Sequence, residues 1–190
     1  KKLRPYEERL MKECGFHTSH VYEDRVHVPL IFCGHSIQPG KIISQQVRSI
    51  DIFPTITELV GLPNKEKIHG ISLVPLLKGG NLEENPVFIE TAVNTTKSLS
   101  TNTIGIRTSE YKYFRDKDSP SKNIHLYNMN NDPLEEKNIF REKPEITKNM
   151  EFLLNKIINE QKITFEKPKN TISDDERDKA IMKLRKLGYI

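Results

Sequence analysis

Residues 26–32 read VHVPLIF, a compact apolar run that Cys33-Gly34 brings to an end. A short apolar run bounded by turn residues is typical of a strand that is buried on both faces. Pro29 cannot donate a hydrogen bond to a neighbouring strand, an objection that a position near the start of the strand would answer. The run therefore predicts a buried strand, and the polar residues 16–23 before it are expected at the rim of a site.

A helix is predicted further along the chain, over residues 49–61 (SIDIFPTITELVG). Asp51 can cap its first turn, Pro54 lies where backbone N–H groups have no helical partner, and Gly61 suits a left-handed end. The apolar side chains that share one face are Ile52, Ile56, Leu59 and Val60. This spacing predicts a helix that packs through one side.

The remainder of the chain predicts a small antiparallel sheet followed by helices. Residues of strand character occur at 87–91, 103–108, 111–115 and 125–129. Ser109-Glu110 is short enough for a hairpin turn between two of these strands. Pro144 opens a run of apolar residues at helical spacing, and a capping box at 173–176 opens a last helix that Gly188 ends.

Charge and composition exclude several classes of protein. The chain has 30 Lys and Arg against 26 Asp and Glu, and these charges are interspersed rather than gathered as in a nucleic-acid binder. No run approaches the roughly 18 apolar residues of a membrane-spanning helix. Two cysteines, Cys14 and Cys33, are too few for a disulfide scaffold or a Cys-based zinc site, and we favour free thiols over a pair. Because Lys1 is followed by no apolar leader, we expect a processed chain or an excised piece.

No complete catalytic motif is present, since the sequence has no Gly-rich phosphate loop, no HExxH and no Gly-x-Ser-x-Gly. The densest polar cluster is residues 16–23 (FHTSHVYE), in which His17 and His20 are three positions apart. Two imidazoles at this spacing on a helix can bind a metal ion, but a third ligand is missing nearby. Ordinary packing is the alternative interpretation of both histidines.

Several segments together resemble the sulfatase family. Residues 22–31 (YEDRVHVPLI) are similar to a sulfatase strand of the form LYEExxRVPLII, and residues 47–56 (VRSIDIFPTI) to a helix of the form VSxVDIxPTIL. Further similar segments follow at 58–62, 69–77, 104–113, 125–138 and 184–190. Each match alone is weak, but together they run in family order over nearly the whole chain.

The resemblance implies an α/β fold: the C-terminal part of an alkaline-phosphatase-like sandwich, with a small antiparallel sheet and packing C-terminal helices. Residues 1–86 would be the C-terminal part of the main sulfatase α/β domain. Residues 87–162 would form the small antiparallel-sheet subdomain with its helix, and residues 163–190 a linker and C-terminal helix.

The same resemblance indicates which parts of a sulfatase this sequence lacks. In the family, a Cys or Ser in a Cys/Ser-x-Pro/Ala-x-Arg motif becomes the formylglycine nucleophile, and neither Cys14 nor Cys33 has that context. The paired aspartates that hold calcium and the family's DHG segment are also missing. We therefore expect the C-terminal portion of a sulfatase cut off after the metal site. It should be inactive alone and hold no cofactor, while its parent enzyme uses calcium and formylglycine.

One active-site element of the family is expected in this sequence. Sulfatases often place a His or Lys four or five positions before the strand's Tyr, where its positive charge contacts the sulfate. His17 lies five positions before Tyr22 and receives this role, although Thr18 occupies the commoner position, and His20 is a weaker candidate. Two further cations, Lys112 and Arg107, could reach toward an anionic substrate, with surface ion pairing as the default interpretation.

The leading hypothesis is therefore the C-terminal part of a sulfuric-ester hydrolase whose parent acts on a sulfated small molecule or glycan. One alternative keeps the fold and changes the ester, as in phosphate or phosphonate hydrolases and phosphoglycerol transferases. Another is a non-catalytic interaction module. The expected partner is the missing N-terminal catalytic half, with no nucleic acid and no membrane span, and the compartment stays undecided.

Overall fold

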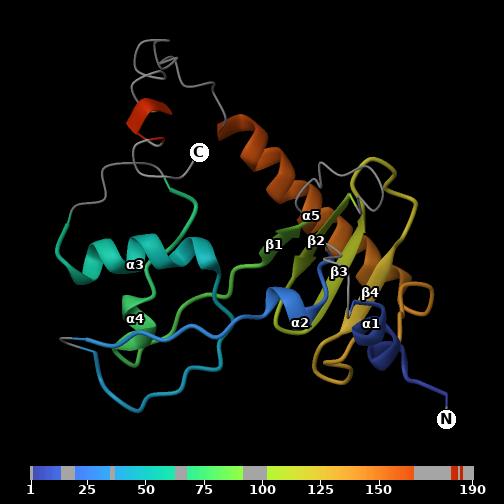
Figure 1. Cartoon of the computed structure of the whole chain (residues 1–190), viewed down its shortest axis with the longest axis horizontal. Coiled ribbons are helices and arrows are strands. Elements are labelled where there is room, and N and C mark those ends of the chain that lie inside the picture. The colour runs from blue at the N-terminus through green and yellow to red at the C-terminus, as the bar shows by residue number, and fades with distance from the viewer. Residues whose placement is uncertain are drawn as a thin grey trace. The chain divides into compact units, whose positions relative to one another are not determined.

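The computed structural model describes residues 2–13, 20–34, 37–62, 68–91, 102–164, 181–183 and 185. The chain divides into two compact units, Lys1–Asn155 and Lys156–Ile190, and each is described by itself. The first unit holds a four-stranded sheet and a group of short helices (Figure 1). No helix among the described residues is both long and apolar enough to cross a membrane.

The sheet is antiparallel, as predicted, and its strands lie in sequence order. Its strands are β1 (Val87–Glu90), β2 (Thr103–Arg107), β3 (Tyr111–Asp116) and β4 (His125–Asn128). Gly105 lies between β1 and β3, where an added Cβ would lie 2.6 Å from the Cβ of Phe114. The close approach of the two strands therefore requires glycine at this position.

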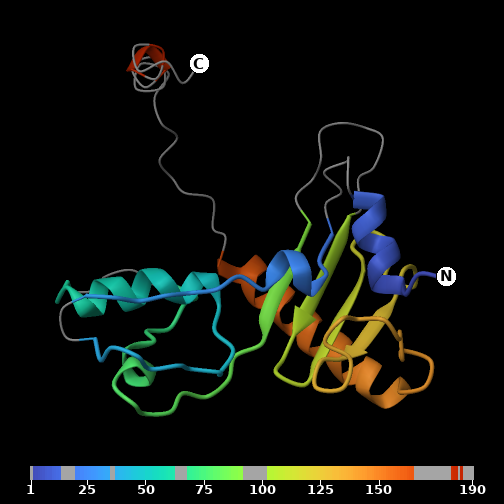
Figure 2. The same cartoon turned by 60° about the horizontal axis from the view of Figure 1, so that its bottom comes forward.

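Each face of the sheet packs against a different part of the chain. One face carries Ile89, Phe114 and Tyr127, which form a core cluster with Val21 and Met129. The other face carries Ile106, Tyr113 and Leu126, which lie opposite one another in the register. Helix α5 (Pro144–Thr164) runs along this second face (Figure 2) and buries Met150 and Leu154. The predicted helix that opens at Pro144 is thereby confirmed.

The predicted helix over residues 49–61 is confirmed with different packing. A 3-10 turn (Ser49–Asp51) leads into α3 (Ile52–Leu59), and Gly61, at φ 71°, follows its end. The buried side chains of α3 are Pro54 and Thr55, whereas Ile56 on the expected apolar face is exposed. Thr55 packs inward because its hydroxyl accepts the Leu73 N–H, next to the short helix α4 (Val74–Leu77), at 2.9 Å.

Residues 27–33 depart from the prediction of a buried strand. The helix α2 (Glu23–Val26) takes up the start of the apolar run, and the residues after it are extended but pair with no described strand. Val28 is 68% exposed and Ile31 83% exposed. A strand that is apolar on both faces is stable only between neighbouring strands and covering layers. The described residues supply neither, so the predicted strand is wrong for this structure.

The two ends of the chain are described in part. The N-terminal helix is α1 (Pro5–Glu13). The last predicted helix falls mostly outside the described residues, which include helical residues 181–183 and 185 of that segment. The capping box at 173–176 and Gly188 also lie outside them.

Candidate functional site

A buried lysine on β3 draws together segments that are far apart in the sequence. The ammonium of Lys112, whose side chain is 0% exposed, lies 3.2 Å from a carboxylate oxygen of Glu23 and 2.9 Å from one of Glu135. Arg107 of β2 contributes a second cation, with its Nε 3.1 Å from Glu23. We call these four residues the Lys112 cluster. A buried charge is stable only when it is paired and hydrogen-bonded, and here each charge has a partner.

Glu23 is the anion shared by both cations. Burial by itself would raise the pKa of the Glu23 carboxyl, but the Lys112 ammonium and the Arg107 guanidinium outweigh it and lower that pKa. Arg107 also donates to the side-chain oxygen of Gln46 and, at 2.9 Å, to the carbonyl of Thr108. The hydrogen bonds of the Arg107 guanidinium thus go to groups of the protein itself. Because its pKa is lowered, the Glu23 carboxyl is ionised at neutral pH.

Glu135 completes the cluster from the loop that follows β4. Its side chain is buried, and its Oε2 accepts the backbone N–H of Glu23 at 2.7 Å. Its φ of 54° lies in the left-handed region, which is uncommon for a residue with a side chain. Burial raises the pKa of the Glu135 carboxyl, although Lys112 opposes the shift. This loop is shaped by Asp132, whose carboxylate accepts the N–H groups of Glu136 and Lys137.

Tyr22 fastens the same segment to the sheet through its ring. The ring meets Phe114 edge-on at 5.3 Å between centroids, and the guanidinium of Arg9 lies 4.1 Å from the ring centroid. Arg9 also donates to the carbonyls of Leu134 and Glu135, at 2.6 and 2.9 Å. Aromatic and cation–π contacts of this kind add to the apolar burial. Helix α1 and the Glu135 loop therefore both hold Tyr22.

The predicted site residues have different outcomes. His17 lies outside the described residues. His20 is half-buried, accepts the Tyr22 N–H at its Nδ1 over 3.3 Å, and meets the Tyr22 ring edge-on. Lys112 and Arg107 lie together at Glu23, three residues after His20. The ion pairing expected at the surface for Lys112 is buried instead, because its strand is covered on both faces.

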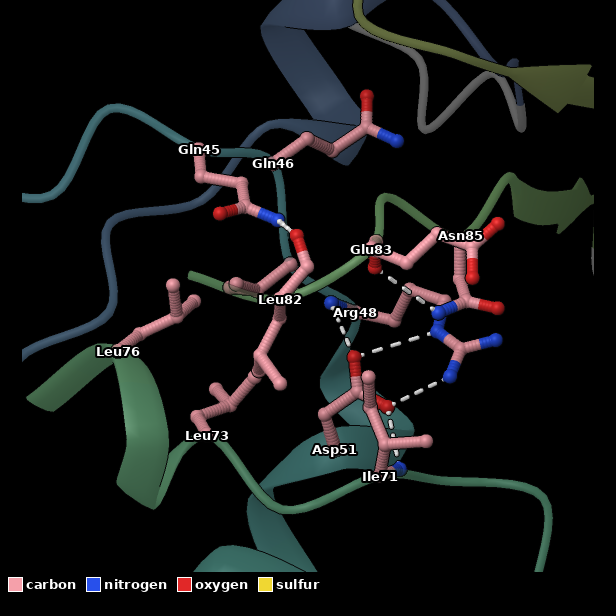
Figure 3. Close-up of a pocket in the computed structure, with 11 residues that line it drawn as sticks. Gln45, Gln46, Arg48, Asp51, Ile71, Leu73, Leu76, Leu82, Glu83 and Asn85 are labelled. Atoms are coloured by element: carbon pink, nitrogen blue, oxygen red, sulfur yellow. Dashed lines mark hydrogen bonds and ion pairs between the residues drawn. The ribbon is translucent and has the colours of Figure 1, made fainter. Parts of the chain in front are cut away.

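Two cavities adjoin these elements. One of about 190 Å³ borders the Lys112 cluster, and its lining includes Arg9, Asp24, His27 and Leu134. The other lies between the 3-10 turn and residues 71–85 (Figure 3) and has about 10 Å³, room for a single water. In it, the Asp51 carboxylate accepts the Ile71 N–H and an Arg48 guanidinium N–H, at 2.9 and 2.8 Å. This second cavity is therefore part of the packing.

The Asp51 carboxylate caps a turn and also binds the loop before α4, where it accepts the Ile71 N–H. Its carboxylate accepts the backbone N–H of Arg48, which caps the 3-10 turn rather than α3 itself. His69 and Gly70 lie in a loop. An added Cβ at Gly70 would overlap the Ile50 carbonyl, so only glycine lets the two segments approach.

The described residues do not form a calcium site. No group of three or more His, Cys, Asp or Glu among them lies close enough together to hold a metal ion. Calcium takes about six to eight oxygen ligands, and the carboxylates of the Lys112 cluster are neutralised by Lys and Arg instead.

Comparison with known families assigns the chain. Residues 13–162 match the family described as N-sulphoglucosamine sulphohydrolase, C-terminal. The chain belongs to this sulfatase family. Human arylsulfatase K is 31% identical over 163 residues, which cover 83% of this chain and 30% of the human protein. The Bos taurus arylsulfatase K is 30% identical over the same shares of the two chains.

Solved sulfatase structures share the fold. BT1596, a 2-O GAG sulfatase, is 28% identical with a TM-score of 0.52, over 59% of this chain and 24% of that chain. The phosphonate monoester hydrolase of Agrobacterium radiobacter is 23% identical with a TM-score of 0.52, over 62% and 26% of the two chains, and shows the fold alone. The predicted α/β sulfatase fold is confirmed, and the chain spans about 30% of the length of its curated relatives.

Sequence reasoning missed the anions of the cluster as residues of the site. Glu23 and Glu135 stand in two of the sulfatase-like segments, and Glu135 follows Asp132-Pro133 closely. Their place in those segments was the available signal, but it could not show that both carboxylates meet the same lysine. Arg9 carried no signal at all, because it lies in a highly charged stretch that predicts only a surface helix or loop.

Proposed function

We propose that this chain is the C-terminal portion of an enzyme that hydrolyses sulfate esters. The observation that carries the proposal is the match of residues 13–162 to the C-terminal part of a sulphohydrolase family. The identity to arylsulfatase K along 83% of the chain supports it. In the whole enzyme the bound calcium and the formylglycine would neutralise the sulfate and attack it, and both would come from outside these residues.

The residues proposed for the reaction are the histidines before α2. A protonated imidazole beside a sulfate ester would stabilise the negative charge that grows on its oxygens. His17 is the proposed sulfate contact in this protonated form. His20 is the second candidate, and because its Nδ1 accepts the Tyr22 N–H, it would act as a neutral ring that donates through Nε2. Lys112 and Arg107 are not proposed as substrate contacts, because their charges are paired with Glu23 and Glu135 inside the first unit.

The proposed substrate is a sulfated small molecule or glycan. The family description names N-sulphoglucosamine, and BT1596, at 28% identity, is a 2-O GAG sulfatase. Both therefore favour a sulfated sugar over a simple aryl sulfate as the natural substrate. The sugar and the position of its sulfate group would be set by loops of the whole enzyme.

The proposed partner is the part of a sulfatase that precedes this portion in its relatives. The apolar run supports this, since Val28, Leu30 and Ile31 are exposed and their segment pairs with no described strand. Such a segment gains stability when neighbouring strands and covering layers enclose it. The partner would supply the metal ligands and the nucleophile.

A paired assay tests the proposed function. The natural polypeptide that contains these residues is produced in a host that forms formylglycine, and the 190-residue chain is produced alone. Both are assayed with a sulfated glucosamine, an aryl sulfate, an aryl phosphate and an aryl phosphonate ester. We expect sulfate turnover by the natural polypeptide and none by the 190 residues, which should also bind no calcium tightly.

Two results would contradict the proposal. Turnover of aryl sulfate by the 190-residue chain alone would show that it carries its own nucleophile. A natural polypeptide that prefers the phosphonate ester would favour the alternative ester class. The fold shared with the phosphonate monoester hydrolase makes this second control necessary.

A further inference from the structure

The backbone at Glu23 is held by the sheet at several atoms at once. Its N–H donates to Glu135 at 2.7 Å, and its carboxylate meets the Lys112 ammonium at 3.2 Å and the Arg107 guanidinium at 3.1 Å. Glu135 in turn lies 2.9 Å from Lys112. One side chain of β3 therefore ties the Glu135 loop and the start of α2 to the same point.

Ion pairing of this kind is a poor route to stability alone. Two carboxylates and an ammonium lose their hydration on burial, and well-packed apolar side chains often stabilise a fold as well. Glu135 also holds a left-handed backbone, with a φ of 54°. Strained backbone of this sort persists where surrounding contacts over-determine it, and it gathers at functional positions. We therefore assign the Lys112 cluster the role of holding the start of α2 and the Glu135 loop in one arrangement.

The restraint on Glu23 is passed to His20 through the neighbouring residue, Tyr22. Tyr22 precedes Glu23, and its ring packs against Phe114 and beneath Arg9. The Tyr22 N–H donates to His20 Nδ1 over 3.3 Å, and the two rings meet edge-on with centroids 5.3 Å apart. An imidazole held through its Nδ1 has its orientation determined by the backbone that donates to it.

We propose that Lys112 and Glu135 are positioning residues that fix His20, before α2, in its place for contact with the sulfate ester. The proposal rests on the proposed function and deepens it, since it assigns buried, non-contacting residues to the same reaction. Neither side chain touches the substrate. They act by holding Glu23, and through Tyr22 they hold the imidazole of His20.

Hydrogen exchange in the 190-residue chain tests the positioning directly. The variants are Glu135→Gln, which keeps the acceptor for the Glu23 N–H but removes the charge, and Lys112→Met. The conservative variant Lys112→Arg and the matched control Lys117→Met complete the set, because Lys117 pairs with Glu90 at the surface. We expect exchange across residues 20–27 to rise roughly tenfold in Glu135→Gln and more in Lys112→Met. In the control Lys117→Met, the exchange rate across residues 20–27 should change less than about twofold. In Glu135→Gln, the exchange rate within β2 and β3 should also change less than about twofold.

Kinetics of the natural polypeptide then separate positioning from a purely structural role. In Glu135→Gln we expect kcat for the aryl sulfate to fall about tenfold while KM stays within about twofold, because a displaced group weakens the transition state more than ground-state binding. Lys112→Arg should recover part of the kcat lost in Lys112→Met. Lys117→Met should keep the wild-type values.

The outcomes are distinguishable. Unchanged exchange across residues 20–27 in Glu135→Gln would overturn the positioning role, and so would raised exchange with an unchanged kcat. A loss of kcat in which exchange rises equally throughout the sheet would overturn it as well, since general destabilisation would then suffice. Absence of turnover of both the sulfated glucosamine and the aryl sulfate by the wild-type natural polypeptide would instead refute the proposed function, while the exchange measurement still decides whether the cluster holds the segment.

Discussion

Strand β3 carries a buried cation on each of its two faces. Lys112 points to the face that holds Glu23 and Glu135, and Arg115, three residues on, points to the face that holds α5. Arg115 is 4% exposed and pairs with Glu151 through its Nε and Nη2, both 3.0 Å from carboxylate oxygens. Both faces of the strand are thus buried although its sequence is partly charged.

The first prediction concerns Glu151 and pH. Burial would raise the pKa of its carboxyl, but the hydrogen bonds from Arg115 and Tyr113 lower it below the reference value of 4.5. A lowered pKa stabilises the fold above the unfolded pKa, and this contribution is lost as the pH falls through the folded one. Glu151→Gln should therefore lower the free energy of unfolding by about 2 kcal/mol at pH 7.

Urea unfolding of the first variant across pH values measures this difference. The difference in free energy of unfolding between wild type and Glu151→Gln should be largest at pH 7 and should shrink as the pH falls below 4.5. The control is Glu145→Gln, whose carboxylate pairs with Lys148 at the surface of the same helix. A difference that stays constant down to the lowest accessible pH would contradict the assigned pKa shift.

At the scale of elements, the sheet depends on the absence of a side chain at Gly105. Its ideal Cβ would lie 2.6 Å from the Cβ of Phe114 and also meet the Tyr113 carbonyl on the neighbouring strand. Neither contact can be relieved by rotating a flexible side chain. The close pairing of β2 with β3, which places Lys112 beside Arg107 in the register, follows from this glycine.

The second prediction is that Gly105→Ala destabilises the chain by about 1–3 kcal/mol, as overpacking in a closely packed interior does. Thermal unfolding followed by circular dichroism measures the loss. Ser109→Ala, in the exposed turn after the same strand, is the control and should stay within about 0.5 kcal/mol of wild type. A Gly105→Ala variant as stable as its control would show that the strands can separate without cost.

At the scale of the whole molecule, the segment at residues 27–33 would distinguish the chain alone from the chain within the proposed larger enzyme. Ile31 is 83% exposed here, whereas Leu154 of α5 is fully buried. A polar substitution at an exposed position has little effect on stability, and the same substitution in an enclosed strand leaves a buried charge. The two residues therefore report on different surroundings.

The third prediction follows from this contrast. Ile31→Lys should change the stability of the 190-residue chain by less than about 0.5 kcal/mol, and it should destabilise the natural polypeptide by about 3 kcal/mol or more. Leu154→Ala, the matched control, should cost about 2–5 kcal/mol in both. Equal small effects of Ile31→Lys in both proteins would show that this segment stays exposed and that the proposed partner does not cover it.

Local pattern was enough for the elements whose partners lie nearby in the chain. Residues of strand character and a short hairpin turn predicted the antiparallel sheet, helical spacing predicted α3 and α5, and a series of short family-like segments indicated the sulfatase fold. These features depend on neighbouring residues, on hairpin pairing and on short motifs, all of which can be read along the sequence.

Tertiary structure alone decided how the charges pair and what the apolar run at residues 27–33 does. Glu23 lies 89 positions before Lys112 and 112 positions before Glu135, so nothing in its local sequence says that the three residues share one buried point. The apolar run has the pattern of a buried strand, yet a strand needs neighbours, and the described residues supply none for it. Local preference can be read from residue order, whereas burial and ion pairing depend on which distant segments meet.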